Sequence, residues 1–184
     1  MAQTCNCCGC SLVDGFTSLV SGSGTSGDPY ELDIIDPMFY SQRYAVRRQR
    51  STNQTITNDT LTEVDFTTAA AGSFNRGWTF TAPSSFTVPV SGIYIFGVNA
   101  AFADNANGTR YVEIIKNDTT VIASSESNSN AGSTHFVAAS SSAPLNGGDI
   151  LKARVRQVAT VSLDIVVSAE QSPVFWAVYI GRFV

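Results

Sequence analysis

Apolar and polar residues alternate with a period of two over most of the chain after residue 60, as they do in half-buried β-strands. Residues 110–116 show this alternation, whereas 92–102 is a longer and mostly apolar run that predicts a central strand. We expect strands at 61–68, 78–80, 86–88, 92–102, 110–116, 119–123, 136–143, 150–158, 161–167 and 174–183. Such a series of short strands, without a credible long helix, predicts an all-β sandwich.

One stretch, Phe86-Thr-Val-Pro-Val-Ser-Gly-Ile-Tyr-Ile-Phe96, joins two of these strands. Pro89 has no amide proton to give to a β-ladder, so we expect it at a strand end or edge. Gly92 frees the backbone for a sharp turn into the central strand.

The first 51 residues have a different character, so we divide the chain into an extended N-terminal arm (1–51) and a head domain (52–184). Residues 21–30 are rich in Gly and Ser, which predicts turns, and 31–35 fits a short extended piece. A helix over 38–50 is possible, although it lacks a clean apolar stripe. The head is long enough to bury a core without disulfides or metal.

Charge is sparse and unevenly distributed. The 184 residues carry a net charge of −4, and only 14% are charged, which argues against nucleic acid as the main partner. Residues 1–42 hold acidic but no basic side chains, and Arg43, Arg47, Arg48 and Arg50 follow at once. We expect these arginines to dock on acidic protein surface, including neighbouring arms, and not on nucleic acid. We expect no signal peptide and no membrane insertion, because no apolar run approaches about 20 residues.

The head resembles the globular head of complement-type proteins, within the tumour necrosis factor-like jelly-roll superfamily. The resemblance covers roughly 52–184 and is carried, in order, by Phe86, Pro89, Gly92, Tyr94 and Phe96, by Ile115-Lys-Asn117, by Leu145 with Gly148-Asp149, and by the aromatic strand 175–183. It implies a ten-stranded jelly roll, a tight homotrimer and a binding or structural role without catalysis. It also implies a hairpin turn at Gly148-Asp149, with Asp149 bonding local backbone. Tyr94, Phe96, Phe175 and Tyr179 would fill the core or the three-fold interface. The collagen-like Gly-X-Y stalk of such proteins is missing.

The arm is similar to the beginnings of bacteriophage minor virion proteins, especially those of actinobacteria. The similarity lies in the Cys/Gly-rich start, in Val20-Ser-Gly-Ser-Gly-Thr25 and in Asp28, Pro29 and Tyr30. It implies an anchor that plugs a trimeric fibre or knob into a virus particle, where it would contact other virion proteins.

Three groups of residues are candidates for metal binding, cross-linking or catalysis. Cys5, Cys7, Cys8 and Cys10 lie within six positions, and three interpretations stay open: cross-linking or packing at a three-fold axis, a structural metal shared by three chains, or free thiols. Asp104, Asn105 and Asn107 fit a plain turn, although some relatives bind calcium near the trimer apex. His135 is the single histidine and fits a surface or interface better than a Ser–His–Asp triad.

We therefore expect no enzyme but a virion structural protein, a trimeric tail or fibre knob that binds host-surface glycan. A capsid decoration protein at three-fold positions is the alternative, and both would be located in the virion. A non-viral secreted or spore-surface trimeric ligand is a further alternative.

Overall fold

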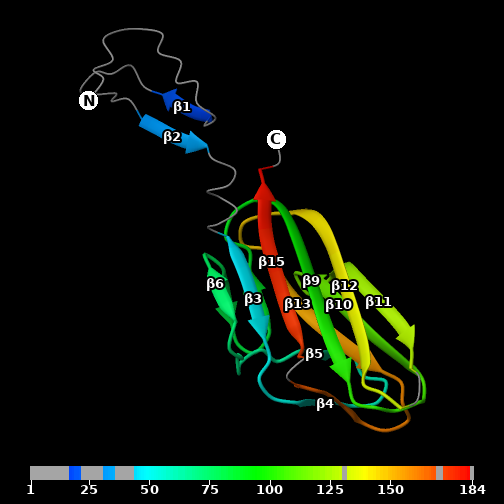
Figure 1. Cartoon of the computed structure of the whole chain (residues 1–184). Helices are drawn as coiled ribbons and strands as arrows, with labels where there is room; N and C mark the ends of the chain where they lie inside the picture. Colours follow the sequence, from blue (N-terminus) through cyan, green and yellow to red (C-terminus); the bar gives the residue numbers. More distant parts are fainter. Residues whose placement is uncertain (1–16, 22–30, 36–43, 130–131, 169–171, 183–184) are drawn as a thin grey trace.

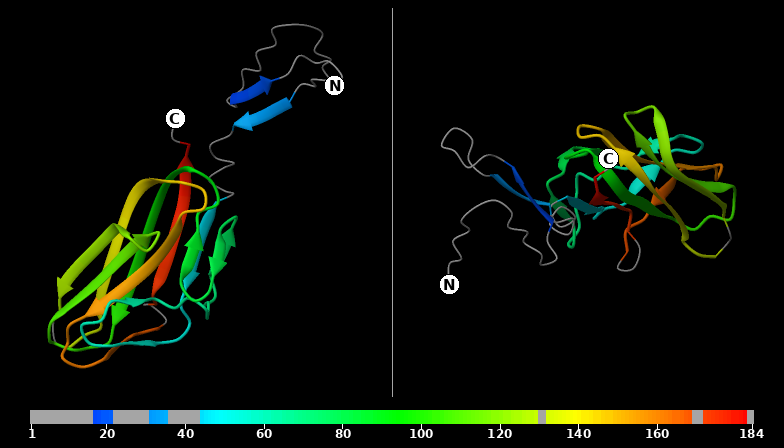
Figure 2. Two further views of the ribbon diagram at one scale, coloured as in Figure 1. Left: turned by 180° about the vertical axis from the view of Figure 1, so that it is seen from behind. Right: turned by 90° about the horizontal axis from the view of Figure 1, so that it is seen from above.

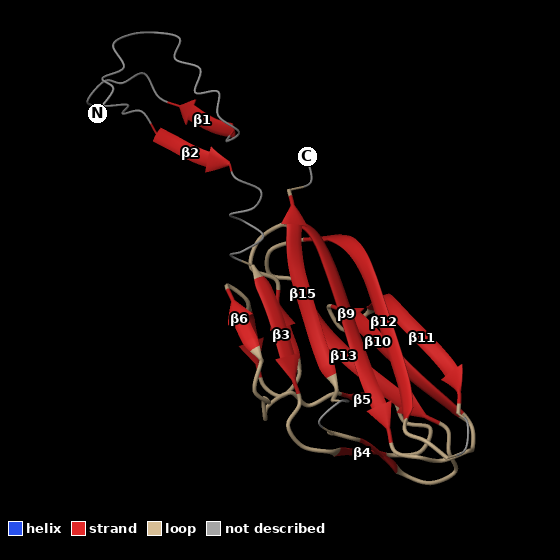
Figure 3. Cartoon of the chain, in the orientation of Figure 1, coloured by secondary structure: helices blue, strands red, loops and turns tan. Residues whose placement is uncertain are grey.

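The computed structural model describes residues 17–21, 31–35, 44–129, 132–168 and 172–182 (Figure 1). In these ranges every regular element is a β-strand (Figure 3), and they contain no helix that is long and apolar enough to cross a membrane. Residues 44–182 build two antiparallel sheets that pack face to face. The all-β, jelly-roll-like sandwich predicted from the sequence is thus confirmed, with more strands than the expected ten.

The first sheet has seven strands. Six of them follow the order β4-β14-β9-β15-β3-β6, and the seventh, β12, also pairs with β9. Its strands are β3 (Ala45–Gln49), β4 (Gln54–Ile56), β6 (Phe74–Arg76), β9 (Gly92–Phe102), β12 (His135–Leu145), β14 (Leu163–Ile165) and β15 (Val174–Gly181). This sheet faces the viewer in Figure 1. The strand expected at 92–102 is confirmed as its central strand, since β9 pairs with β12 along one side and with β15 along the other.

The second sheet has six strands, in the order β11-β10-β13-β8-β7, with β5 also paired to β13. Its strands are β5 (Thr62–Glu63), β7 (Thr79–Thr81), β8 (Ser85–Thr87), β10 (Thr109–Lys116), β11 (Thr120–Asn128) and β13 (Ile150–Gln157). It faces the viewer when the molecule is turned by 180° (Figure 2, left). Residues 124–128, expected in a loop, extend β11, whereas most of the strand expected at 61–68 is loop.

A separate two-stranded hairpin precedes the sandwich. Its strands β1 (Thr17–Ser21) and β2 (Glu31–Ile35) are antiparallel, with Thr17 opposite Ile35. The sandwich begins earlier than the boundary expected at residue 52, because β3 lies inside the seven-stranded sheet between β15 and β6. The possible helix over 38–50 is therefore wrong for residues 45–49, which are extended. Alternating side chains on β3 place Val46 in the core, which favours a strand over a helix here.

Aromatic rings fill the space between the sheets. Phe86 of the six-stranded sheet stacks on Phe175 of the seven-stranded sheet, with ring centroids 4.1 Å apart. Phe66 and Phe80 pack around Phe86, and Tyr179 packs edge-on against Tyr94. The residues expected in the core or in the three-fold interface, Phe86, Tyr94, Phe96, Phe175 and Tyr179, all lie in the core of one chain.

The turn residues have distinct physical roles. Pro89 lies two residues beyond the end of β8, where its missing amide proton costs no ladder bond. Gly92 is needed for close packing and not for a turn, since a Cβ there would lie 2.2 Å from the Tyr179 ring. Gly148 has the positive φ of 93° that a tight turn requires.

Asp149 ties two turns together. One carboxylate oxygen, Oδ2, accepts a bond from the Asn146 amide at 2.9 Å, and Oδ1 accepts one from the Asn117 side chain at 2.8 Å. Asn117 in turn accepts a bond from the amide of Ile150 at 2.8 Å. Residues of the two short motifs that carried the family resemblance thus meet through this carboxylate.

Replacing Asp149 with Ala should destabilise the sandwich by about 1–3 kcal/mol, because it leaves partly buried donors unpaired. Urea unfolding at fixed protein concentration measures this loss. Asp118→Asn is the control, because it removes only an ion pair of a largely exposed side chain and should cost less than about 1 kcal/mol. Equal effects of the two substitutions would show that Asp149 does not tie the turns.

Candidate functional site

The seven-stranded sheet has a second apolar face, which points away from the core. Tyr94 and Phe96 of β9 point inward, so Ile93 and Ile95 point outward. The register places Ile95 beside Val178 of β15. We call the following set the outward apolar face: Phe74, Ile93, Ile95, Phe136, Trp176, Val178 and Ile180.

The outward apolar face is exposed and lacks charge at its centre. Ile95, Ile180 and Phe136 are 39%, 45% and 48% exposed. The three adjacent strands β12, β9 and β15 contain no Asp, Glu, Lys or Arg. Exposed apolar side chains that gather on one face of a domain are typical of interaction surfaces.

Trp176 lies flat across this face because of Gly97. The two residues are paired across β15 and β9. A Cβ on residue 97 would lie 2.6 Å from the indole ring, closer than any real contact. The glycine therefore lets the ring cover the sheet and leaves a smooth surface for a partner.

The outward side of the six-stranded sheet is charged instead. Lys152 and Arg154 alternate along β13 with buried apolar residues. Arg154 forms an ion pair with Glu113 of β10, a carboxylate that is only 2% exposed. Lys152 bridges Glu63 at 3.0 Å and Asp118 at 2.8 Å. The two outer faces of the sandwich thus differ: the face of the seven-stranded sheet is apolar, and the face of the six-stranded sheet carries several ion pairs.

The arginines assigned to a docking arm lie in the fold. Arg48 donates to the carbonyls of Phe66 and Thr67 and covers the Phe80 ring at 3.8 Å. Arg47 donates to the carbonyl of Gly72 at 3.0 Å.

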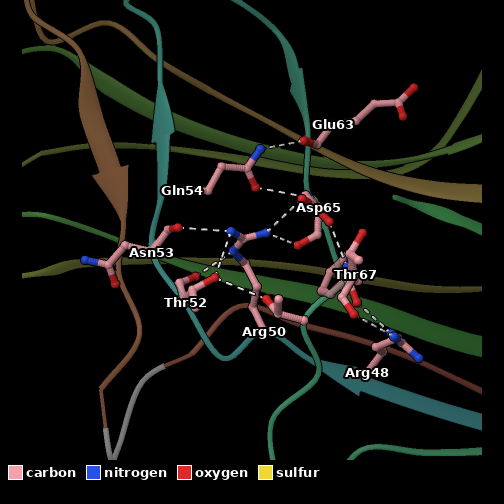
Figure 4. A network of polar contacts seen from close by, with 10 residues as sticks. Arg48, Arg50, Thr52, Asn53, Gln54, Glu63, Asp65 and Thr67 are labelled. Carbon is pink, nitrogen blue, oxygen red and sulfur yellow. Dashed lines mark hydrogen bonds and ion pairs between the residues drawn. The ribbon is translucent and has the colours of Figure 1, made fainter. Parts of the chain in front are cut away.

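Arg50 is 5% exposed and holds the turn after β3 to the loop after β5 (Figure 4). It donates to the carbonyls of Thr52, Asn53 and Asp65. Burial lowers the pKa of Arg50, and the nearby Asp65 carboxylate opposes that shift.

The loop that suggested calcium is held by an arginine. Arg110 is fully buried, and its guanidinium donates to the carbonyls of Asn105, Asn107 and Thr109. The side chain of Asn105 accepts a bond from the amide of Asn107. These oxygens are thus engaged with protein donors, and the described residues contain no cluster of three His, Cys, Asp or Glu side chains placed to bind a metal.

His135 opens β12, and its Nε2 atom lies 2.6 Å from the Ser127 hydroxyl oxygen of β11. Within the described ranges, no carboxylate bonds its ring, so the acid of a catalytic triad is not in place there. Cys5, Cys7, Cys8, Cys10, Asp28, Pro29, Tyr30 and Arg43 lie outside the described residues, so the interpretations of the cysteine cluster stay predictions.

The outward apolar face was not predicted from the sequence, although its signal was present. The strand 174–181 is apolar at odd and even positions alike, a pattern typical of strands that are covered on both sides.

Comparisons with known proteins agree on the fold. The chain is similar to the solved structure of Eiger TNF from S. frugiperda, with a TM-score of 0.57 and 17% identity over 77% of this chain and 94% of that one. It is also similar to murine APRIL, with a TM-score of 0.55 and 14% identity over 73% and 97% of the two chains. These similarities show the tumour necrosis factor-like jelly-roll fold. No family model and no curated protein matches the sequence.

The Glu63–Lys152 pair should make stability depend on pH. Burial would raise the pKa of Glu63, but hydrogen bonds from Ser84 and Lys152 hold it below its ordinary value of 4.5. Hydrogen bonds to Asp118 and Glu63 raise the pKa of Lys152 above 10.5. The stabilisation by Glu63 is therefore present above pH 4.5 and is lost as the pH falls through the lowered value.

Glu63→Gln should lower the free energy of unfolding at pH 7 by about 0.5 kcal/mol, since solvent screens this half-exposed carboxylate. The difference between the two proteins should shrink as the pH falls from 5 to 3. Urea unfolding across this range measures it, and a difference that is independent of pH would contradict the prediction.

Proposed function

We propose that this chain is a homotrimeric jelly-roll binding module whose protomers associate through the outward apolar face. The observation that supports this most directly is the exposed, uncharged centre of that face. Its cross-strand neighbours are small or polar, such as Ser140 and Ser142 of β12, so a neighbouring subunit can approach the backbone closely. When a neighbouring subunit covers exposed Ile and Phe side chains, the free energy of association becomes more favourable by about 25 cal/mol per Å² of apolar area removed from water.

A trimer, in preference to a dimer, is supported by the resemblance of the head to complement-type proteins. In a closed ring of three subunits, each subunit contacts its two neighbours through two different surfaces. Such a ring would cover the outward apolar face of every subunit. The charged side of the six-stranded sheet then points outward, where its ion pairs stay in water.

We also propose that the trimer is a virion component, the knob of a tail or fibre that contacts the host surface. The sequence resemblance of the arm to phage virion proteins supports this role. A knob with three copies of one weak site gains affinity through effective concentration, which suits a repetitive host glycan.

The trimer is tested with two isoleucines of matched exposure on opposite faces. Ile95 is 39% exposed on the outward apolar face, and Ile150 is 37% exposed on the six-stranded sheet. Ile95→Asp should convert the trimer to monomers in sedimentation velocity, because a carboxylate would be buried in the interface. Ile150→Asp should leave the trimer intact. A monomeric wild-type protein, or the same effect of both substitutions, would overturn the proposal.

The virion role is tested by copy number in purified particles. DNA-containing particles from cells that carry this gene in its natural setting are banded on a density gradient and analysed by quantitative mass spectrometry. A few trimers per particle would support the knob, whereas hundreds of chains would support capsid decoration. If the chain is absent from particles and present at the cell surface, the virion role is wrong and the secreted or spore-surface alternative gains support.

A further inference from the structure

We propose that a hollow on the six-stranded sheet binds one neutral pyranose ring of a glycan. This inference rests on the binding role proposed above and gives that role a site within each chain. The hollow has a volume of about 240 Å³ and is lined by Leu61, Tyr111, Glu113 and Arg156.

The hollow lies on the side of the sandwich opposite to the outward apolar face. Tyr111 and Glu113 come from β10, and Arg156 stands opposite Tyr111 on β13. Leu61 directly precedes β5, which pairs with β13. Association through the outward apolar face would therefore leave all three hollows of a trimer open to solvent.

The floor of the hollow is rigid. Glu113 is 2% exposed, and its Oε1 accepts a bond from Nε of Arg154 at 2.6 Å. Its Oε2 accepts a bond from the Tyr111 hydroxyl, also at 2.6 Å. Burial and the Glu113 carboxylate raise the pKa of Tyr111, so the phenol stays protonated. A ring held in this way is ready for a ligand without losing further rotamer freedom.

Arg156 offers hydrogen-bond donors at the rim. Its guanidinium lies 3.6 Å from Asp59 and 3.9 Å from Glu126, both longer than a hydrogen bond. Its planar fork thus lies between two carboxylates without a short bond to either. A sugar hydroxyl both donates and accepts, so neighbouring hydroxyls can accept from Arg156 and donate to Asp59 or Glu126.

The apolar side chains and the charges around the hollow favour a neutral ligand with an apolar face. Leu61 is 40% exposed and offers an apolar surface for the C–H face of a sugar ring, next to Tyr111, whose ring lies 5.7 Å from the Arg156 guanidinium. Around the hollow stand the carboxylates of Asp59, Glu113 and Glu126 and the guanidiniums of Arg154 and Arg156. The excess of carboxylates disfavours anionic ligands, and a cation would compete with two guanidiniums already in place.

The size fits one ring. Pockets for drug-sized ligands have volumes of roughly 300–1,000 Å³, which is more than the hollow offers. A single ring bound this way should have a dissociation constant of about 1–10 mM, equivalent to roughly 3–4 kcal/mol. Three such sites on one trimer would raise the avidity for a repeating glycan.

The test is an NMR titration of the full chain with glucose, galactose, mannose, N-acetylglucosamine and N-acetylgalactosamine, one at a time. At least one sugar should give saturable shifts that centre on the amides near Tyr111 and Arg156. Leu61→Trp, which fills the hollow, should weaken that binding at least tenfold. Ile150→Trp, at an exposed position on the same side of β13, should leave it unchanged. Arg156→Lys, which keeps the charge but loses the planar fork, should also weaken binding.

The proposal is overturned if none of the five sugars saturates, if Leu61→Trp binds as tightly as the wild type, or if sialic acid binds more tightly than the neutral sugars. Sedimentation of each variant separates this outcome from failure of the proposed function. A trimer that binds no sugar refutes only the hollow, whereas a monomer refutes the assembly whatever the titration shows.

Discussion

The stacking of Phe86 on Phe175 is the contact on which the rest of the sandwich depends. One ring comes from each sheet, and their planes are inclined by only 17°, so the pair sets the distance and alignment of the two layers. Stacked aromatic pairs contribute about 0.5–1.5 kcal/mol beyond the area that they bury. Because Phe175 must point inward, the period of two sends Trp176 outward, and the same strand that closes the core exposes an apolar surface.

The outer faces of the two sheets differ in charge. The six-stranded sheet meets water through Lys152 and Arg154, which pair with acids on neighbouring strands. The seven-stranded sheet has no charges on the adjacent strands β12, β9 and β15, and it leaves apolar side chains exposed there. The surfaces that we propose for assembly and for glycan binding therefore lie on opposite sides of the sandwich.

Much of the fold could be predicted from the sequence, because the strands with strong patterning carry their own signal. The strand 92–102 is long, apolar and bounded by turn residues, and the structure has it at the same bounds. Residues 45–49 were harder to predict, since only Val46 joins the core cluster and Arg47 and Arg48 obscure the apolar pattern. Residues 64–68 were also predicted wrongly as strand. Their alternation reflects the burial of Val64 and Phe66 in the core, and their amides bond to the single carbonyls of Ala153 and Pro83 outside a continuous ladder.

The candidate site was predictable only in part, because a sequence shows charge but not its partners. Four arginines near residue 50 suggested docking on another molecule, yet Arg48 and Arg50 satisfy carbonyl oxygens of their own chain. The loop at 104–107 was expected to be a plain turn, with calcium as the lesser alternative, and its carbonyls accept hydrogen bonds from the buried Arg110. The buried guanidinium of Arg110 carries a positive charge and several N–H donors, so it can bind several carbonyl oxygens at once, as a metal ion can. Unlike a metal ion, it is part of the chain. The loop at 104–107 is thereby held by donors of the chain itself.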